Sequence, residues 1–484
     1  MDEATGGSRL EQQRRERLEM LRAEGIDPYG ERFDDVELTE AIRTRYVEEE
    51  DEQTARAAGR IVLLRDIGKL IFLTLRDSTG TLQLGLSKKA LGDQWALAKA
   101  LDLGDIIGAD GTLGRTKTGE LTLWTERVTL LAKALLPPPE KYHGLADVDL
   151  RYRRRYVDLW ANPEVMHRFR LRSRIVEGIR RFLSERGFLE VETPMMQTIA
   201  GGAAARPFIT HHNTLDLDLY LRIAPELFLK RLLVGGMERV FEINRNFRNE
   251  GLSTRHNPEF TMLELYQAYA DYHVMMDVTE ALIGWLVETC CHGPKLPFGD
   301  LMIDYTRPWR RARYADLLQE YAGCIPDDAA RVRAKARSLG IEETNMDDAV
   351  VVNAVFEETV EPNLVDPTFV LDYPAELCPL TRRSKSDPRY AERFELYIGR
   401  MELANAYTEL NDPAVQEENF RRQLRGQTET MATMDEDFVT ALKYGMPPAG
   451  GLGIGIDRLI MLLTGATSIR DVILFPLLKP ARGT

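Results

Sequence analysis

The sequence predicts an α+β protein that has a small N-terminal β-barrel of the oligonucleotide-binding type and a larger part with an antiparallel sheet flanked by helices. Two observations lead to this fold class. Residues 58–136 contain about five short strands with alternating polarity, broken by glycine, which is the pattern of a small closed barrel. Residues 151–484 mix helices with hairpins instead of repeating βαβ units, which favours an antiparallel sheet.

Changes in composition divide the chain into four segments. The barrel is expected at residues 58–136, where the short strands begin and end. Three consecutive prolines then start a stiff linker, residues 137–150. Residues 1–57 are expected to form a helical and acidic extension, and residues 151–484 the larger part. Within the larger part, residues 295–370 are rich in helix-forming sequence and poor in motifs, so we expect a helical insertion there.

Size and charge exclude some classes of protein. A chain of 484 residues with 44% hydrophobic and 29% charged residues is an ordinary globular protein with a large core. A net charge of -13 argues against a protein that coats DNA or RNA without selectivity. Binding of RNA through a local patch stays open, because phosphate contacts depend on nearby charges. Two basic segments are candidates either for such a patch or for solvated faces: Arg14, Arg15, Arg17 and Arg22, and Arg151, Arg153, Arg154 and Arg155.

Cysteine usage and hydropathy predict a compartment. The four cysteines show no CxxC spacing, and the adjacent pair Cys290 and Cys291 cannot easily form a disulfide, so reduced thiols are expected. The N-terminus is charged from Asp2 onward and shows no signal peptide. No apolar run approaches the roughly 18 residues that a membrane span needs. We therefore expect a cytoplasmic protein with no membrane partner.

The stretch Phe247–Tyr266 predicts a hairpin with chemistry on one face. Gly251 and the pair Asn257-Pro258 separate two runs of alternating residues. Because side chains alternate across a strand, each run presents one set of side chains on a single side. These sets are Arg248 and Glu250 on the first run, and Phe260, Met262, Glu264 and Tyr266 on the second. Such a face suits an anionic, ring-bearing ligand with a cation beside it; taken alone, it could also be a solvated face.

A second polar set lies between Arg393 and Asp412. Asn405, Tyr407 and Glu409 alternate on one strand face, and a turn near Gly399 would bring Glu395 opposite Glu402. Two such carboxylates are hard oxygen donors suited to Mg²⁺. Simple alternation places Glu402 on the other face from Asn405 unless a bulge intervenes, and the sequence leaves these two arrangements open.

A glycine-rich strand near the C-terminus runs into an apolar helix. Glycines from Gly450 onward let a ligand approach the backbone, and Arg458 lies where the helix begins. This run is not a dinucleotide fingerprint, because no βαβ unit follows it. Residues 114–120 have the glycine spacing of a P-loop but lack its Lys-Ser/Thr ending. His211 and His212 would point apart on a strand, which argues against a zinc site.

These segments together resemble the active site of class II aminoacyl-tRNA synthetases. Residues 172–194 are similar to their motif 1, the hairpin Phe247–Tyr266 to motif 2 and the stretch Gly451–Leu463 to motif 3. More narrowly, the chain resembles bacterial-type lysyl-tRNA synthetases along nearly its whole length. Further similar stretches are Arg222–Phe228 and Glu402–Asp412.

The resemblance implies a class II catalytic domain and an OB-fold barrel that binds the anticodon. It also implies an activity, a lysine–tRNA ligase. Such an enzyme uses ATP and Mg²⁺ to form lysyl-adenylate, then transfers the lysyl group to the 3′-end of tRNA(Lys), releasing AMP and pyrophosphate. A homodimer is implied as well.

Roles for individual residues follow from the same resemblance. Arg248 and Arg458 are the implied catalytic residues. The implied lysine-binding set is Gly202, Glu226, Arg248, Glu264, Tyr266, Asn405, Tyr407 and Glu409. The implied ATP-binding set is Arg248, Glu250, His256, Phe260, Glu402 and Arg458. The implied Mg²⁺ ligands are Glu395 and Glu402, and the implied anticodon contacts are Arg65, Phe72 and Gln83.

Several alternatives stay open at this point. Phe72 could belong to the core of the barrel, and His256 could be a structural histidine. A related ligase that attaches a lysine-like amino acid to a protein is a rival function, although such relatives lack the N-terminal barrel. A paralog that only binds RNA or protein is a second rival. The acidic and basic residues implied for catalysis argue against it, since all of them are present: Arg248, Glu250, Glu395, Glu402 and Arg458.

Overall fold

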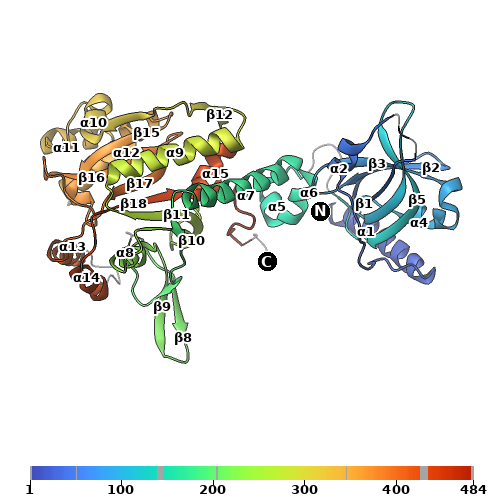
Figure 1. The fold of residues 1–484 in the computed structure, drawn as a ribbon, viewed down its shortest axis with the longest axis horizontal. Helices are drawn as coiled ribbons and strands as arrows, with labels where there is room; N and C mark the ends of the chain where they lie inside the picture. Colours follow the sequence, from blue (N-terminus) through green and yellow to red (C-terminus); the bar gives the residue numbers. More distant parts are fainter. Residues whose placement is uncertain are drawn as a thin grey trace. The chain divides into compact units, whose positions relative to one another are not determined.

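The computed structural model describes residues 3–48, 50, 52–138, 145–202, 205–344, 346–425 and 434–480. The chain forms two compact units, Met1–Ala146 and Asp147–Thr484, each with its own core (Figure 1). Part of the expected linker, residues 139–144, lies outside the described residues. Within the part of the chain that the structure describes, no helix is long and apolar enough to cross a membrane.

The N-terminal unit is a closed five-stranded barrel, as predicted. Its strands pair in the order β1-β2-β3-β5-β4. Every second residue of β2 is buried inside the barrel, from Ile71 through Leu73 to Leu75, which is the alternation expected of a barrel wall. The elements are α1 (Glu3–Ala23), α2 (Thr39–Arg45), β1 (Thr54–Asp66), β2 (Leu70–Arg76), β3 (Thr81–Ser87), α3 (Lys88–Leu91), η1 (Gly92–Gln94), α4 (Trp95–Ala100), β4 (Ile106–Arg115) and β5 (Leu121–Ala132).

The second unit is built on an eight-stranded sheet in the order β14-β15-β16-β17-β18-β11-β10-β6. The interior pairs are antiparallel, as expected, while the two edge pairs, β14 with β15 and β6 with β10, are parallel. The strands are β6 (Leu189–Glu190), β10 (Arg239–Phe247), β11 (Glu259–Ala268), β14 (Arg310–Arg313), β15 (Thr368–Pro374), β16 (Tyr390–Tyr397), β17 (Glu402–Thr408) and β18 (Ala449–Gly455).

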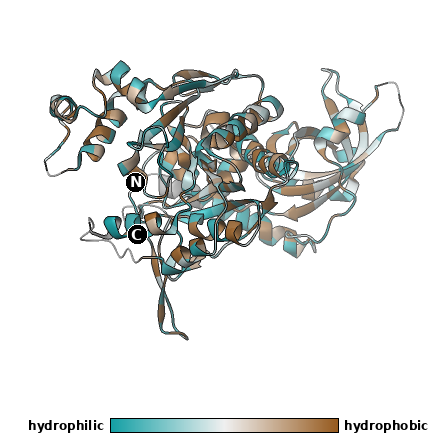
Figure 2. Cartoon of the chain, turned by 60° about the vertical axis from the view of Figure 1, so that its left-hand side comes forward, coloured by the Kyte–Doolittle hydropathy of each residue, from teal (hydrophilic) through white to brown (hydrophobic). Residues whose placement is uncertain are grey.

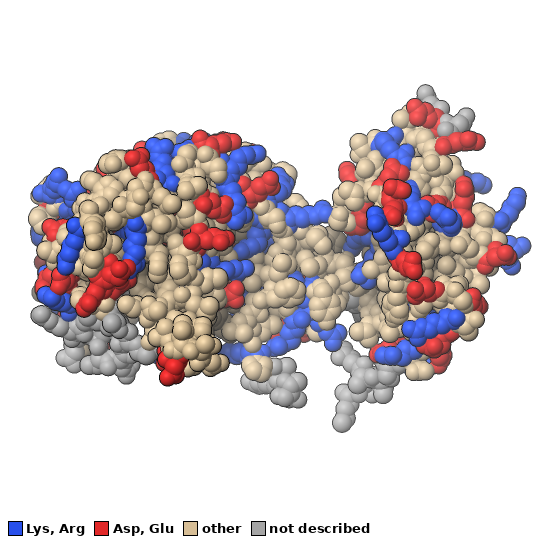
Figure 3. Space-filling view, turned by 60° about the horizontal axis from the view of Figure 1, so that its bottom comes forward, with Lys and Arg blue, Asp and Glu red and all other residues tan. Residues whose placement is uncertain are grey.

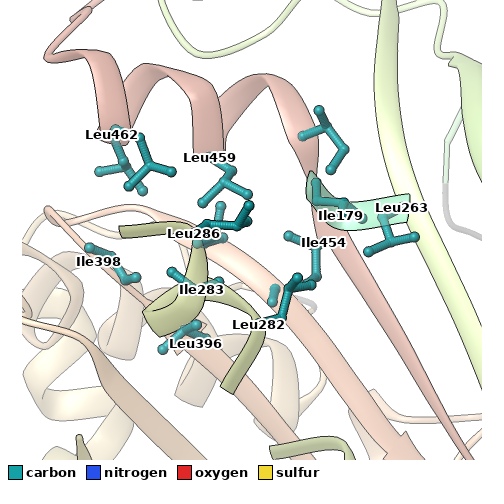
Figure 4. Close-up of a cluster of buried hydrophobic side chains, with 14 of the residues drawn as sticks. Ile179, Leu263, Leu282, Ile283, Leu286, Leu396, Ile398, Ile454, Leu459 and Leu462 are labelled. Carbon is teal, nitrogen blue, oxygen red and sulfur yellow. The ribbon is translucent and has the colours of Figure 1, made fainter. Parts of the chain in front are cut away.

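Three helices contribute to the core that covers one face of this sheet: α7 (Pro163–Ser184), α9 (Tyr272–Cys290) and α15 (Ile456–Thr464). In α7 the buried residues recur every three or four positions, so they form one apolar stripe. Helix α9 starts where the Asp271 carboxylate accepts hydrogen bonds from two free backbone N–H groups. Leucines and isoleucines from these helices meet those of β11, β16 and β18 (Figure 4). The other face of the sheet is therefore left for polar residues.

The helical insertion expected at residues 295–370 is helical only in its middle part. The segment starts with a hairpin, β12 (Lys295–Phe298) and β13 (Leu301–Asp304), and supplies β14 and the start of β15 to the main sheet. Strand β14 reads Arg-Arg-Ala-Arg, a polar edge strand of four residues that alternation cannot reveal. Only the middle part is helical, with α10 (Tyr314–Ala322), α11 (Ala329–Ser338), α12 (Asp348–Thr359) and η2 (Glu361–Asn363).

The remaining elements flank the sheet. A separate three-stranded sheet contains β7 (Met196–Gln197), β8 (Ile209–His212) and β9 (Leu217–Leu221), and its β8–β9 hairpin projects beyond α8 in Figure 1. Apolar and polar stretches alternate along the helices and strands in Figure 2. The other helices are α5 (Val148–Arg153), α6 (Arg155–Ala161), α8 (Glu226–Val234), η3 (Ala375–Leu377), α13 (Pro413–Arg425), α14 (Glu436–Lys443) and η4 (Ile469–Asp471).

Two arginines of the basic segments have structural roles. Arg14 is buried, and its guanidinium donates to the carbonyl oxygens of Ala134 and Leu136. Arg155 is fully buried and pairs with Asp158 at 2.5 Å. Neither side chain is a solvated charge or available to RNA, so both interpretations of the basic segments fail for these two residues.

Candidate active site

One face of the main sheet carries a row of polar residues across four adjacent strands. Glu264 on β11 pairs with Gly453 on β18, Gly453 with Asn405 on β17, and Asn405 with Glu395 on β16. Paired residues project to the same side of a sheet, so three side chains from separate motifs share one face. This is the face opposite the apolar core, as the buried neighbours Leu263 and Ile454 show.

A parallel row lies beside the first one. Tyr266 pairs with Gly451, Gly451 with Tyr407, and Tyr407 with Arg393. Glu409 follows directly after β17, and its backbone N–H donates to the Ala449 carbonyl at 2.8 Å. The alternation predicted for Tyr266 on β11 and Tyr407 on β17 is therefore confirmed by the strand register.

The bulge that the sequence left open is present in β17. Leu396 pairs with Ala404, but the next residue, Tyr397, pairs with Glu402, so Leu403 is an extra residue. Both Leu403 and Ala404 are buried in the apolar core. The extra residue returns Glu402 to the polar face, where it lies with Asn405.

Glycines of β18 place no side chain on the polar face. A Cβ atom on Gly451 would lie 2.0 Å from Glu409 Oε1 and 2.5 Å from Tyr266 Cε1. Real Cβ contacts are never that short, so only glycine fits between these two side chains. Glu409 Oε1 is buried and has no hydrogen-bond partner among the described residues. A buried acceptor without a donor is a candidate contact for the ammonium group of a ligand.

Glu226 and Glu409 share one internal cation. Lys230 is fully buried, and its Nζ lies 2.6 Å from Glu226 Oε1 and also pairs with Glu409. The Tyr407 hydroxyl donates to the same Glu226 oxygen at 2.6 Å. Gly202 has a φ of +87°, and a Cβ at this position would lie 3.4 Å from the Glu226 Cβ. Burial opposes the charge on Lys230, but the two carboxylates outweigh it and raise the pKa of the ammonium.

Glu264 is a further buried carboxyl, and it forms no ion pair with the residues that the structure describes. Burial and the charges of Glu226 and Glu242 raise the pKa of Glu264 to about 8, so this group is largely protonated at pH 7. The Tyr266 hydroxyl lies 3.3 Å from Glu264 Oε2. Glu242 differs, because Arg222 donates to it at 2.6 Å. Glu264 therefore offers an uncharged carboxyl in the middle of the polar face.

Arg248 and Glu250 lie in a loop, so the prediction that they share a strand face is wrong. Strand β10 ends at Phe247, and the loop continues to the start of β11 at Glu259. The residues Gly251 and Asn257-Pro258 that mark the turn keep the whole segment irregular. The Arg248 guanidinium is largely buried, lies 5.1 Å from the centre of the Phe260 ring, and its Nε has no partner among the described residues. Burial lowers the pKa of Arg248, against the opposing charges of Glu250 and Glu402.

His256 and Arg458 meet at the edge of the same site. The His256 Nε2 atom lies 3.2 Å from Arg458 Nη2, and the Nδ1 atom lies 2.9 Å from Ser253 Oγ. Burial and the charge of Arg458 lower the pKa of His256, so the ring is neutral at pH 7. A neutral ring accepts from Arg458 through Nε2 and donates from Nδ1 to the serine. His256 thus holds a cationic side chain in the site.

Asp457 joins the three motif segments. This buried carboxylate accepts from Arg172 of α7 at 2.6 Å and from the backbone N–H of Thr261 of β11 at 2.7 Å. It belongs to the first turn of α15, next to Arg458. Residues that are far apart in the sequence are therefore fixed to one another by a single side chain.

Glu395 and Glu402 lie on one face but differ in their surroundings. Glu395 accepts from the hydroxyls of Tyr373 and Tyr397, both at 2.7 Å, and pairs with Arg393. The Glu402 side chain is 42% exposed, and among the described residues its ion pair is a long one of 3.4 Å to Arg458. Partial burial and the charge of Glu395 raise the pKa of Glu402. Two neighbouring carboxylates of this kind favour a bound cation.

The barrel carries its own candidate site on its outer surface. Arg65 and Phe72 are paired on β1 and β2, with the Arg65 guanidinium carbon 5.7 Å from the ring centre. Phe72 lies on the outer side of β2, opposite the buried residues, so it is not part of the barrel core. Gln83 donates to Thr122 at 2.8 Å. Trp124 lies next to Phe72, with ring centroids 6.1 Å apart.

Sequence reasoning missed three residues of these sites. Lys230 stands next to Arg231 in a mainly apolar helix, and nothing in the spacing separates it from a surface lysine. Arg393 fills the polar face beside Glu395, and its alternation with Glu395 and Tyr397 was a usable signal. Trp124 alternates with Thr122 on β5, so its place on the barrel surface could also have been predicted.

Comparison with known proteins agrees with this geometry. The chain matches the family described as tRNA synthetases class II (D, K and N) over residues 147–479 and the OB-fold nucleic acid binding domain over residues 55–131. It is 54% identical to the lysine–tRNA ligase of Carboxydothermus hydrogenoformans, covering 96% of this chain and 97% of the relative. Identity to the lysine–tRNA ligase of Pelotomaculum thermopropionicum is 52%, covering 96% and 94%. The chain therefore belongs to the lysine–tRNA ligase family of class II tRNA synthetases.

Proposed function

We propose that this protein activates lysine with ATP to lysyl-adenylate and transfers the lysyl group to the 3′-end of tRNA(Lys), releasing AMP and pyrophosphate. The observation that carries the proposal is the juxtaposition on one sheet face of an acid-lined pocket above Gly451 and the two arginines Arg248 and Arg458. An acid-lined pocket suits the ammonium groups of lysine, and the arginines suit its carboxylate and the phosphates of ATP.

The lysine substrate is assigned to the pocket above the glycine floor. Glu409 and Tyr266 receive the ε-ammonium, because the free Glu409 Oε1 and the Tyr266 ring meet above Gly451. Glu226 and the backbone at Gly202 receive the α-ammonium, while Glu264 and Tyr407 support the pocket walls. Arg248 and Asn405 meet the carboxylate. A shorter or neutral amino acid would leave buried acceptors of the pocket without a hydrogen-bond partner. This cost makes such a site selective for lysine.

ATP is assigned to the part of the face around the motif 2 loop. Phe260 stacks on the adenine, with Glu250 and His256 near the base and phosphates. Arg248 neutralises the α-phosphate and Arg458 the γ-phosphate, positioned by their contacts with Phe260 and His256. The lysine carboxylate then attacks the α-phosphorus in line with the leaving pyrophosphate. Catalysis comes from fixed geometry and from positive charge placed in advance, without a protein nucleophile.

A Mg²⁺ ion fits Glu395 and Glu402. The exposed Glu402 carboxylate, with its pKa raised beside Glu395, is a group that a cation would keep ionised. Mg²⁺ is usually held by one or two carboxylates together with substrate phosphates, so a third protein ligand is not needed. When bound, the ion would neutralise charge on the phosphates of ATP.

The barrel is assigned to the anticodon. Phe72 and Trp124 offer an aromatic surface on which unstacked bases can lie, and Arg65 and Gln83 offer hydrogen-bond donors beside it. Because the four cysteines are free thiols, we place the reaction in the cytoplasm.

We assign the surface that contacts the second copy of a homodimer to the β8–β9 hairpin and to the strand β7 before it. This part exposes large apolar side chains: Met195, Met196, Ile209, Leu215 and Leu217. Figure 3 shows few charged side chains over the hairpin. An exposed apolar surface of this kind is typical of a protein interface.

The activity is tested by pyrophosphate exchange. We expect labelled pyrophosphate to enter ATP only when lysine and Mg²⁺ are both present, because adenylate formation needs the acid-lined pocket filled and the phosphates neutralised. Aspartate and asparagine are the controls, since the matching family model also covers the ligases for these amino acids. Equal exchange with either of them, or none with any amino acid, contradicts the proposal.

Replacing Phe72 with alanine is expected to weaken tRNA charging and leave pyrophosphate exchange unchanged. Loss of a stacking surface costs roughly 1–3 kcal/mol per base, so the KM for tRNA should rise about tenfold. The side chain lies on the outer face of β2 with the barrel core behind it, so the barrel should still fold. Steady-state aminoacylation measures the effect. A folded variant with the parental KM for tRNA removes Phe72 from the anticodon site.

A further inference from the structure

Lys230 occupies an unusual place for a lysine. The side chain is fully buried at the end of the acid-lined pocket, and its ammonium contacts carboxylates from two separate elements, Glu226 of α8 and Glu409 after β17. It also lies 5.4 Å from the centre of the Tyr407 ring. Three of the side chains assigned to lysine binding are therefore in contact with one protein ammonium.

We infer that Lys230 is a positioning residue of the lysine pocket, whose ammonium holds the side chains of Glu226 and Glu409 together by ion pairing while the site is empty. This inference rests on the proposed function. Two buried carboxylates that face the same space repel each other and are costly to leave unpaired. One internal cation between them removes that cost and pairs with Glu409 through Oε2, so Oε1 keeps no hydrogen-bond partner among the described residues.

Charge balance shows why a single cation suits this pocket. Burial and the charge of Glu226 raise the pKa of Glu409 to about 8 against the charge of Lys230, and burial raises the pKa of Glu264 to about 8 as well. When Glu226 and Glu409 are both ionised, they and Lys230 together carry one negative charge. The ε-ammonium of a bound lysine then brings the local sum to zero. Without Lys230 the pKa of Glu409 would rise further, and lysine would have to displace a more tightly held proton.

The neighbouring strands and helices also place tyrosine and charged side chains around Glu226 and Glu409. Tyr407 of β17 and Tyr266 and Glu264 of β11 face the pocket. Glu242 of β10 is neutralised by Arg222, and Asp435 and Asp437 at the start of α14 are neutralised by Arg231. Lys230 is thus the cation that pairs directly with Glu226 and Glu409 among the residues the structure describes.

The test is the pH dependence of lysine use in a Lys230→Gln variant. Glutamine keeps a hydrogen-bond donor but no charge, so the carboxylate pair becomes easier to protonate. Protonation of Glu409 weakens lysine binding at pH values below the raised pKa of this carboxyl and not above it. We expect the acid limb of log(kcat/KM) for lysine to move up by one pH unit or more. That shift lowers kcat/KM at pH 7 by about tenfold, since one proton gives about a tenfold change per pH unit. The KM for ATP should stay at the parental value.

A matched control exists in the barrel. Lys133 is also fully buried and also pairs with two carboxylates, Asp102 and Asp105, both at 2.7 Å. Lys133→Gln makes the same chemical change outside the catalytic unit. We expect it to leave the pH profile of lysine-dependent pyrophosphate exchange unchanged, which separates the effect of Lys230 from a general loss of a buried ion pair.

The outcomes are distinct. An acid limb that moves up in Lys230→Gln, with the KM for ATP unchanged, supports the inference. A limb that stays in place, or a loss equal for lysine and ATP at every pH, overturns it. Lys230→Met carries the same expectation if the glutamine variant does not fold. Absence of lysine-dependent exchange in the parent protein would contradict the proposed function itself and not only the role of Lys230.

Discussion

Replacing Gly451 with alanine is expected to lower lysine use by about 100-fold while the protein still folds and binds ATP. The new Cβ would lie 2.0 Å from Glu409 Oε1 and 2.5 Å from the Tyr266 ring, and both side chains are buried with little room to move. Overpacking of this kind costs about 1–3 kcal/mol, and it displaces the acceptors assigned to the ε-ammonium. A displacement near 1 Å lowers rates by about 100-fold. The measurement is kcat/KM for lysine in pyrophosphate exchange.

Gly453→Ala is the matched control for this change. Its Cβ would lie 3.2 Å from the flexible end of Met262. The Asn405 carbonyl oxygen and the Glu264 side chain would both lie farther away, at 3.9 Å. Met262 can shift by a few tenths of an ångström, so we expect a much smaller loss. Equal losses in the two variants would show that any Cβ on this strand disturbs the site, and the specific role of Gly451 would be wrong.

Replacing Arg248 with alanine is expected to lower the rate of adenylate formation more than the affinity for lysine or ATP. Its guanidinium is largely buried, lies against Phe260 and leaves Nε without a partner among the described residues, so it is free to meet a ligand. A preplaced group that stabilises charge in the transition state typically contributes about 10²–10³-fold in kcat. Single-turnover formation of lysyl-adenylate measures this rate without the later transfer step.

Arg255→Ala provides the control for Arg248. Arg255 lies in the same loop, but its side chain is exposed and donates to the Arg400 carbonyl at 3.2 Å. Its removal takes away the same charge from the loop without touching the pocket, so a rate close to that of the parent is expected. A comparable fall in both variants would mean that the loop needs only its total positive charge.

Much of the site could be predicted because alternation in strands is a strong constraint. The side of β11 that carries Glu264 and Tyr266 follows from the period of two, and the register places it beside Asn405 and Tyr407. The barrel was predictable for the same reason, since its strands are regular and bounded by glycines. In both units the pattern is set by which face is buried.

Other parts depend on contacts that one strand or loop does not encode. Arg248 follows a strand in the sequence, yet it lies in a loop whose course is fixed by hydrogen bonds to Pro258 and Arg206. Strand β14 is recognisable only through its partner β15. The burial of Lys230 depends on Glu409, which lies far along the chain, so local sequence indicates only a helix with a lysine in it.

The extra residue in β17 adds a side chain to the core without moving the carboxylate beside it. Asn405 and Glu402 both lie on the polar face, although three positions separate them in the sequence. Deleting Leu403 would restore plain alternation, in which Glu402 still pairs with Tyr397 and stays on the polar face. The bulge therefore lets Leu403 and Ala404 both pack into the core while the order of polar residues across the sheet stays the same.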